Sequence, residues 1–248
     1  MRIAVAGGTG TVGRRIVEAV RAQGDEPIVL ARSAGVDLIT GTGADAALDG
    51  VDAVIDAVNS PSLTEAGSTE FFTTASGTLF RAAHRAGARH LVLLSIVGVD
   101  RIPHEYYAGK LAQERTVEAA AIPTTIARTT QFHEFAQQAF GFAKLGPLHV
   151  APRARTQPVA AGEVATHLAR LAAGPALGRA TDLAGPREER LDDMVRRYGR
   201  AVGHRGWMPS INAPGKQMAG LRAGLGLPGD DATLGSQTFD EWLRSVTR

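Results

Sequence analysis

Apolar positions recur along the chain with two alternating periods, and the alternation predicts a repeating strand–helix unit. The run at 2–6 is apolar and has the length of a strand, and the apolar residues at 12–20 stand three or four apart, as on an amphipathic helix. Further strands are expected at 27–31, 36–39, 51–58, 90–94 and 124–128, and further helices within 41–50, at 70–86 and at 106–121. This order is typical of an α/β protein with a doubly wound parallel sheet.

From residue 129 onward the alternation becomes less regular. Helices are expected at 161–173, 191–202 and 215–225, and strands at 148–150, 157–160 and 181–184. The Gly- and Pro-rich stretch at 203–235 predicts loops around one helix. We expect one domain over 1–248, in which 129–248 contributes a small α+β substrate lobe, because 248 residues suit a single large core.

Glycines separate the first strand from the first helix. Gly7, Gly10 and Gly13 follow the strand at three-residue spacing and open the helix. Glycine lets the backbone approach a pyrophosphate closely, and the positive end of the helix dipole favours its negative charge. We therefore expect a nucleotide to contact the loop and the first helical turn at Gly7, Thr9, Gly10, Thr11, Val12 and Gly13.

The second and fourth predicted strands each end on polar residues. Arg32 and Ser33 follow the second strand, where an acid would favour NAD and an arginine favours the 2′-phosphate of NADP. Asn59 follows the fourth strand and is expected over the cofactor crevice. We therefore predict NADP(H) in preference to NAD(H), with Arg14 as a second candidate cation; the alternative is that Arg32 is a solvated loop charge.

Candidate chemistry follows the fifth strand, which delivers Ser95. Tyr106 and Lys110 are four residues apart in a helical segment, so both side chains project from one helix face. An ammonium near the phenol would lower the pKa of Tyr106 and make its hydroxyl a usable proton donor. Such a spacing also arises by chance as a surface pair, and Tyr107 is turned by about 100° from the face of Lys110.

These segments together resemble the short-chain dehydrogenase/reductase superfamily, and within it the atypical, NmrA-like NAD(P)-binding branch. The resemblance covers nearly the whole chain. It rests on GGTGTVGR at 7–14, VLARS at 29–33, GVDAVIDAV at 50–58, YYAGK at 106–110, QPVAAGEVA at 157–165, TDLAGP at 181–186 and TFDEWL at 238–243. It implies a Rossmann-type fold in which Tyr106 is the catalytic acid/base, Lys110 holds the nicotinamide ribose and tunes the tyrosine, and Ser95 orients the substrate carbonyl.

Two positions depart from the pattern of the superfamily. Thr74 stands where an asparagine often anchors a water for proton relay, so proton delivery is expected to differ. Thr42 follows Gly41 at the place where an acid commonly lies beside the adenine.

The residues after the sixth strand are expected to line the substrate side of the crevice: Gln131, Phe132 and His133. A pocket-lining or helix-capping role for His133 is favoured over a catalytic one, because Tyr106 already supplies an acid/base. The other histidines show no metal-ligand spacing, and we predict no metal site.

Composition excludes several classes of function. The net charge of +2 argues against a basic surface for nucleic acid, and the absence of cysteine excludes disulfides and thiolate sites. No apolar run reaches the length of a membrane span and the N-terminal run has strand length, so a cytoplasmic protein without a membrane partner is expected. The helices that begin near Glu70 and His104 are candidate faces for a homodimer.

We predict an NADPH-dependent oxidoreductase that transfers a hydride to a small-molecule carbonyl or quinone. One alternative is a redox sensor of the NmrA type that binds the dinucleotide without turnover, which Thr74 favours and the Tyr106/Lys110 pair disfavours. A second alternative is a nucleotide-sugar epimerase or dehydratase, which Arg32 and the short C-terminal segment disfavour.

Overall fold

The structure, a computed structural model, describes residues 1–145 and 148–246, and its chain divides into two compact units. The first unit comprises Met1–Ile96, His104–Arg128 and Gly162–Thr181, and the second comprises Val97–Pro103, Thr129–Ala161 and Asp182–Arg248. Part of the segment 129–248 therefore packs within the first unit.

A mainly parallel sheet runs through the first unit. Its strand order is β5-β4-β3-β1-β2, and β10 pairs with β5. The pairs β1/β2, β1/β3, β3/β4 and β5/β10 are all parallel. The strands are β1 Arg2–Ala6, β2 Glu26–Leu30, β3 Ala53–Asp56, β4 His90–Ile96, β5 Thr124–Thr129 and β10 Gly178–Arg179. The predicted Rossmann-type doubly wound sheet is confirmed.

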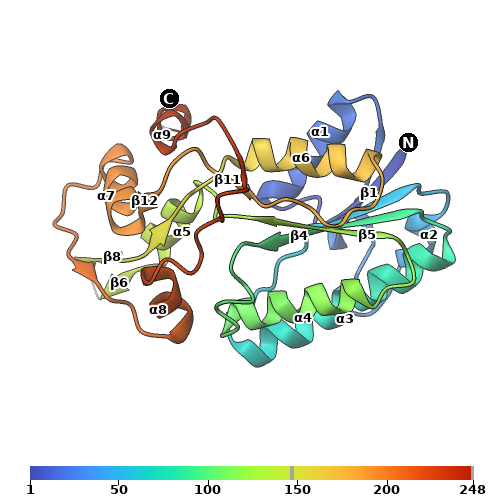
Figure 1. Cartoon of the computed structure of the whole chain (residues 1–248), viewed down its shortest axis with the longest axis horizontal. Helices are drawn as coiled ribbons and strands as arrows, with labels where there is room; N and C mark the ends of the chain where they lie inside the picture. The colour runs from blue at the N-terminus through green and yellow to red at the C-terminus, as the bar shows by residue number, and fades with distance from the viewer. Residues whose placement is uncertain (146–147, 247–248) are drawn as a thin grey trace. The chain divides into compact units, whose positions relative to one another are not determined.

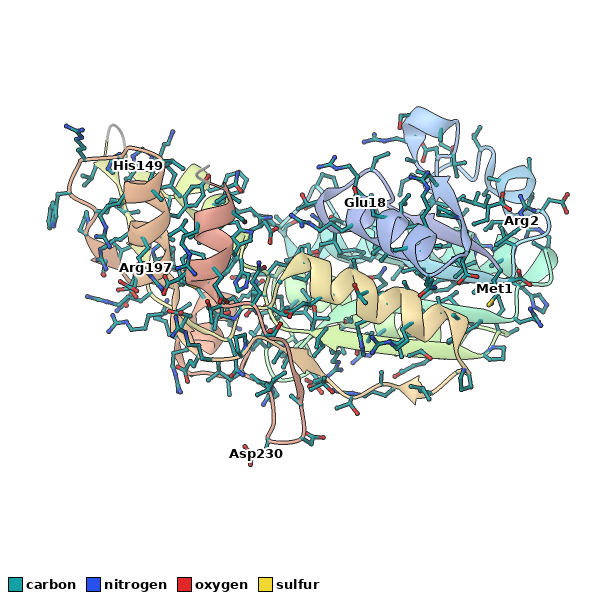
Figure 2. The ribbon with its side chains drawn as sticks, turned by 90° about the horizontal axis from the view of Figure 1, so that it is seen from above. Met1, Arg2, Glu18, His149, Arg197 and Asp230 are labelled. Atoms are coloured by element: carbon teal, nitrogen blue, oxygen red, sulfur yellow. The ribbon has the colours of Figure 1, made fainter. Side chains whose placement is uncertain are left out.

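Helices cover both faces of this sheet, as the doubly wound arrangement requires. Figure 1 shows α1 and α6 on one face and α3 and α4 on the other, and Figure 2 shows α1, which carries Glu18, beside α6. The helices are α1 Thr11–Ala22, α2 Ala44–Leu48, α3 Glu65–Arg85, α4 Tyr106–Glu118 and α6 Ala161–Ala173. An apolar cluster packs α3 against the sheet: Ala4 and Ala6 of β1 share it with Leu79 and Phe80 of α3.

The second unit is built from short elements. Its strand pairs are β6 Lys144–Leu145 with β7 Leu148–His149, β8 Ala151–Pro152 with β13 Ser210–Ile211, β9 Arg155–Thr156 with β12 Glu189–Arg190, and β11 Leu183–Ala184 with β14 Thr233–Leu234. Its helices are α5 Phe135–Phe142, α7 Leu191–Ala201, α8 Lys216–Arg222 and α9 Phe239–Val246. A small apolar cluster of Ala136, Met194, Phe239 and Trp242 joins α5, α7 and α9.

Several predicted elements differ from those of the structure. The strand expected at 36–39 is wrong: Asp37 makes a turn there, its carboxylate accepting from Ile39 N at 2.8 Å, while only Val36 is buried. A short 3₁₀ helix, η1 Arg32–Ala34, lies between β2 and this turn. The strand expected at 157–160 is wrong: β9 ends at Thr156, and Val159 forms an isolated bridge. The helices α5 and α9 were not predicted.

The helix predicted at 70–86 begins five residues earlier, as α3. Thr64 caps it there, because its hydroxyl accepts from Gly67 N at 3.3 Å. No helix in the described ranges combines the length and the apolar character needed to cross a membrane.

Candidate functional site

The glycine loop brings the start of α1 close to the strand ends. Gly7 has φ +75°, and a Cβ on it would lie 2.6 Å from the carbonyl oxygen of Ala57, just beyond β3. A Cβ on Gly13 would collide with the carbonyl oxygen of Gly7. Since side chains are excluded at both positions, the helix can approach β1 and β3 only with glycine here.

The start of α1 fits a pyrophosphate. Gly10 provides no side-chain cap, and the first turn contains no acid, so no carboxylate competes for the first helical N–H groups. A Cβ on Gly10 would meet only the carbonyl oxygen of Gly7, at 3.2 Å, and would otherwise point into open space. Thr9, Gly10 and Thr11 are exposed there, whereas Val12 is buried beneath the turn.

Two arginines flank this loop. Arg32 and Ser33 begin η1 and are exposed, and within the described part of the chain the guanidinium of Arg32 has no ion-pair or hydrogen-bond partner. Arg14 instead donates from Nη1 to the carbonyl oxygen of Thr9 at 2.8 Å. The glycine loop and these residues therefore fit a dinucleotide, and the guanidinium of Arg32 at the end of β2 is available to a phosphate.

Tyr106 is the first residue of α4 and is half-buried. Its hydroxyl donates to Oδ1 of Asn59 at 2.6 Å, and its ring stands edge-on to Phe72 with centroids 5.6 Å apart. Burial of the phenol raises its pKa above the usual value, and neighbouring Tyr107 adds to the rise. The predicted lowering of the Tyr106 pKa is therefore wrong for this arrangement.

The Lys110 ammonium does not lower the pKa of Tyr106 in this arrangement, because it is hydrogen-bonded to other groups. The side chain is only 4% exposed, and Nζ donates to the carbonyl oxygen of Leu94 at 2.7 Å and to Oε1 of Gln113 at 2.6 Å. Burial lowers the pKa of Lys110 to about 8, while the charges of Asp56 and Glu114 oppose the shift.

Ser95 lies in a neighbouring buried cluster. It is 1% exposed, and its hydroxyl donates to Oε1 of Glu114. Glu114 also pairs with Arg128 through two hydrogen bonds, of 2.8 and 2.6 Å. In this arrangement the Ser95 hydroxyl is engaged inside the protein, so holding a substrate oxygen would require another rotamer.

Three functional candidates were missed in the sequence. Asp56, Ser76 and Gln113 are fully buried and lie one hydrogen-bond step from Lys110 or from each other. Two signals were available: Asp56 follows three apolar residues at the end of β3, and Gln113 stands three residues after Lys110 on the same helix.

The residues predicted to line the substrate belong to the second unit. Gln131 accepts from Thr156 Oγ1 at 2.6 Å, and Phe132 forms an isolated bridge with Val159. His133 is fully buried, with its ring 5.9 Å from those of Phe239 and Trp242 and Nε2 3.1 Å from the carbonyl oxygen of Gln237. These contacts give His133 a packing role, and contact of these residues with a substrate stays a prediction. Among the described residues, no three His, Asp or Glu side chains are grouped to hold a metal.

The parallel sheet and the glycine loop define a Rossmann-type nucleotide-binding fold. The chain belongs to the NAD(P)H-binding family, whose model matches residues 7–174. No curated protein has significant sequence similarity to the chain.

Solved structures of similar fold include redox enzymes and a sugar-nucleotide enzyme. The triphenylmethane reductase of Citrobacter sp., complexed with NADP(H), has a TM-score of 0.72 at 15% identity, over 100% of both chains. The NADPH-dependent quinone oxidoreductase of Escherichia coli, complexed with NADPH, has a TM-score of 0.70 at 17% identity, over 99% of this chain and 100% of the other. An NAD-dependent NDP-hexosamine 5,6-dehydratase of tunicamycin biosynthesis has a TM-score of 0.73 at 15% identity, over 99% and 96%. At these identities the likeness concerns the fold alone.

Proposed function

We propose that the protein is an NADPH-dependent oxidoreductase that reduces a carbonyl or quinone compound. The observation that carries this proposal is the pair Tyr106 and Lys110, one turn apart at the start of α4, in the same unit as the glycine loop. Two of the similar structures are reductases that hold NADP(H) or NADPH, which supports the same class of reaction.

The bound nicotinamide would supply the hydride, and the residues of this chain would supply orientation and the proton. Tyr106 is protonated at neutral pH, but its raised pKa makes the phenol a weaker acid, so proton donation would require the bound cofactor and substrate to lower that pKa. Asn59 Oδ1 accepts the hydrogen bond of that hydroxyl in the present arrangement, so a substrate oxygen would replace the Asn59 amide oxygen as the acceptor. Lys110 would hold the nicotinamide ribose through its ammonium.

NADP(H) is the preferred cofactor in this proposal. Arg32 and Ser33 follow β2 and are exposed, and Arg32 has no partner among the described residues. An arginine at this position matches a 2′-phosphate through paired hydrogen bonds, whereas an acid would have favoured the ribose hydroxyls of NAD.

A redox sensor that binds NADP(H) without turnover is the second candidate. It is favoured by the partners of the three predicted catalytic side chains: Tyr106 is bonded to Asn59, Lys110 to Gln113 and Ser95 to Glu114. A reductase has to exchange at least the first of these bonds for contacts with its ligands, whereas a sensor does not.

The experiment is a calorimetric titration of the purified protein with NADPH and with NADH, followed by turnover of quinones, ketones and aldehydes. NADPH binding that is tighter than NADH binding, together with oxidation of NADPH by at least one of these compound classes, is expected. Binding without turnover across the panel would favour the sensor, and tightly held NAD in the purified protein would favour a sugar-nucleotide enzyme.

A matched pair of tyrosine variants makes the turnover assay specific. Tyr106→Phe is expected to remove most ketone reduction and to preserve NADPH affinity. Tyr107→Phe is the control, because Tyr107 is 3% exposed and lies in the core. Equal losses in both variants would assign the effect to packing, and full activity in Tyr106→Phe would remove Tyr106 from the mechanism.

A further inference from the structure

Three side chains from different elements form a polar cluster inside the first unit. Asp56 lies at the end of β3, Ser76 on α3 and Gln113 on α4, and each is 0% exposed. Ser76 Oγ donates to Asp56 Oδ2 at 2.6 Å, and Gln113 Nε2 donates to the same oxygen at 3.1 Å and to Ser76 Oγ at 2.8 Å. The other carboxylate oxygen, Asp56 Oδ1, accepts from Val58 N at 3.2 Å.

These contacts determine which way the Gln113 amide faces. The Asp56 carboxylate accepts hydrogen bonds, so the NH₂ group of Gln113 must point toward it. The amide oxygen then faces the opposite way, where it accepts from the Lys110 ammonium at 2.6 Å. A flipped Gln113 amide would place its oxygen against the Asp56 carboxylate and its NH₂ group against the Lys110 ammonium. Only one orientation of the amide is therefore compatible with both neighbours.

We propose that Gln113, oriented by Asp56, is a positioning residue that fixes the Lys110 ammonium and links its protonation to the buried charge of Asp56. The effect of Lys110 on cofactor binding rests on the proposed function, in which Lys110 holds the cofactor ribose. The link between the Asp56 charge and the protonation of Lys110 is a property of the free protein.

The charges around Lys110 single out Asp56 as the controlling one. Glu114, on the same helix, is already paired with Arg128 of β5 at 2.6 Å, which offsets its charge. Burial raises the pKa of Asp56, and the hydrogen bond from Ser76 and the charge of Lys110 oppose that rise. Asp56 has no arginine partner among the described residues, so Lys110 is the cation that acts on its carboxylate. The phenol of Tyr106 is neutral near pH 7, because burial raises its pKa.

Burial and the charge of Asp56 act on the pKa of Lys110 in opposite directions. Burial lowers the pKa of Lys110 to about 8, and the Asp56 charge raises it against that shift. Removing the Asp56 charge is therefore expected to lower the Lys110 pKa further, by about one unit, the lower end of the effect of a nearby opposite charge. At pH 8 the charged fraction of Lys110 would then fall about fivefold.

The test compares the pKa of Lys110 in the wild type and in Asp56→Asn, which keeps the shape of the side chain. Lys110, Lys144 and Lys216 are the lysines of the sequence, so protein labelled with [6-¹³C]lysine gives few signals to titrate by NMR. Substituting each of the other two lysines by arginine assigns the Lys110 signal. Ser76→Ala is the control, because Ser76 contacts Asp56 and Gln113 and leaves the Lys110–Gln113 bond in place.

The expected result is a Lys110 pKa lowered by about one unit in Asp56→Asn and by less in Ser76→Ala, which removes one hydrogen bond that lowers the Asp56 pKa. Gln113→Leu is expected to broaden or move the Lys110 signal as well, since one of the two hydrogen-bond acceptors of the ammonium is lost. An unchanged Lys110 pKa in folded Asp56→Asn would overturn the proposal, as would an equal shift in Ser76→Ala.

A second readout separates this inference from the proposed function. NADPH affinity, measured by titration at a series of pH values, should fall as the pH rises and Lys110 loses its proton. In Asp56→Asn this fall should begin at a lower pH than in the wild type. If the NMR pKa moves while NADPH affinity does not follow it, the link between Asp56 and Lys110 is correct and the role of Lys110 at the cofactor is wrong.

Discussion

Two sets of ion pairs, one in each unit of the protein, lie in different surroundings. In the first unit, Glu114 and Arg128 form an ion pair whose side chains are only 4% and 5% exposed. In the second unit, Arg187, which is 52% exposed, pairs with Glu189 of β12 and Asp240 of α9. The first pair is almost free of solvent, whereas Arg187 is screened by it.

This difference determines what a single substitution can do. A buried ion that loses its partner retains its desolvation penalty with nothing to offset it, so the effect is large. An exposed ion that loses its partner is solvated by water, so the effect is small. The comparison teaches that the buried pair of Glu114 and Arg128 contributes strongly to stability, while the exposed pairs of Arg187 contribute small increments.

The largest effect is expected for Arg128→Met, which leaves Glu114 buried without a cation. The free energy of unfolding should fall by about 3–5 kcal/mol, as measured by urea denaturation. The double variant Glu114→Leu/Arg128→Met removes both charges and should recover much of the loss. A loss below about 1 kcal/mol in Arg128→Met would break the comparison, because the buried pair would then behave like a surface pair.

The next effect concerns Arg32, a cation without a partner among the described residues. Arg32→Ala should weaken NADPH binding about 10–100-fold, since a charge-assisted phosphate contact contributes about 1.5–3 kcal/mol. NADH affinity and thermal stability should stay near the wild type, which calorimetric titration and thermal melts would check. An equal fold-loss of affinity for NADPH and NADH would show that Arg32 does not contact the 2′-phosphate.

A pH effect on stability follows from the burial of Lys110. Between pH about 8, its folded pKa, and the ordinary lysine pKa near 10.4, the unfolded chain binds a proton that the folded chain lacks. Stability therefore rises with pH in this window, by at most about 1.4 kcal/mol per unit. Lys110→Met should remove this contribution, and exposed Lys144→Met should keep it, in urea denaturation at a series of pH values.

The raised pKa of Tyr106 acts in the opposite direction at higher pH. The folded chain keeps a phenol proton that the unfolded chain loses, so stability falls above pH about 10. The Lys110 effect is therefore read between pH about 8 and 10. A Lys110→Met profile that is parallel to the wild type would contradict the burial of a charged ammonium.

The smallest effect is expected for Arg187→Ala. Its partners Glu189 and Asp240 also pair with Arg197 of α7, labelled in Figure 2, so neither acid is left alone. The loss of unfolding free energy should stay below about 1 kcal/mol and shrink further in about 1 M salt. A loss comparable to that of Arg128→Met would show that exposure is not the property that separates the pairs of Arg187 from the pair of Glu114 and Arg128.

Most of the sheet of the first unit was predictable, because its signals are local. β1, α1 and β2 follow from short apolar runs and helical spacing, and the glycine positions follow from a turn that excludes side chains. The four-residue spacing of Tyr106 and Lys110 likewise places both on one helix. Local backbone geometry thus accounts for the fold and for the choice of candidate residues.

The partners of those residues were not predictable, because they come from distant segments. Asn59 and Tyr106 are 47 residues apart, and Asp56 and Gln113 are 57 apart. The expectation that Lys110 would act directly on the phenol overlooked Gln113 and Leu94 as competing acceptors. In the second unit, two-residue strands leave little periodicity, although Phe239, Trp242 and Leu243 do carry the helical spacing of α9.

The central claim, that the protein is an NADPH-dependent reductase in which Tyr106 donates the proton, is tested most directly by single-turnover oxidation of bound NADPH with a ketone, in the wild type and in Tyr106→Phe. The account predicts that the reduced-nicotinamide signal decays in the wild type and slows by about 10²–10⁴-fold in Tyr106→Phe, with NADPH affinity retained. NADPH that stays reduced in the wild type with every ketone, aldehyde and quinone, or an undiminished rate in Tyr106→Phe, would contradict it.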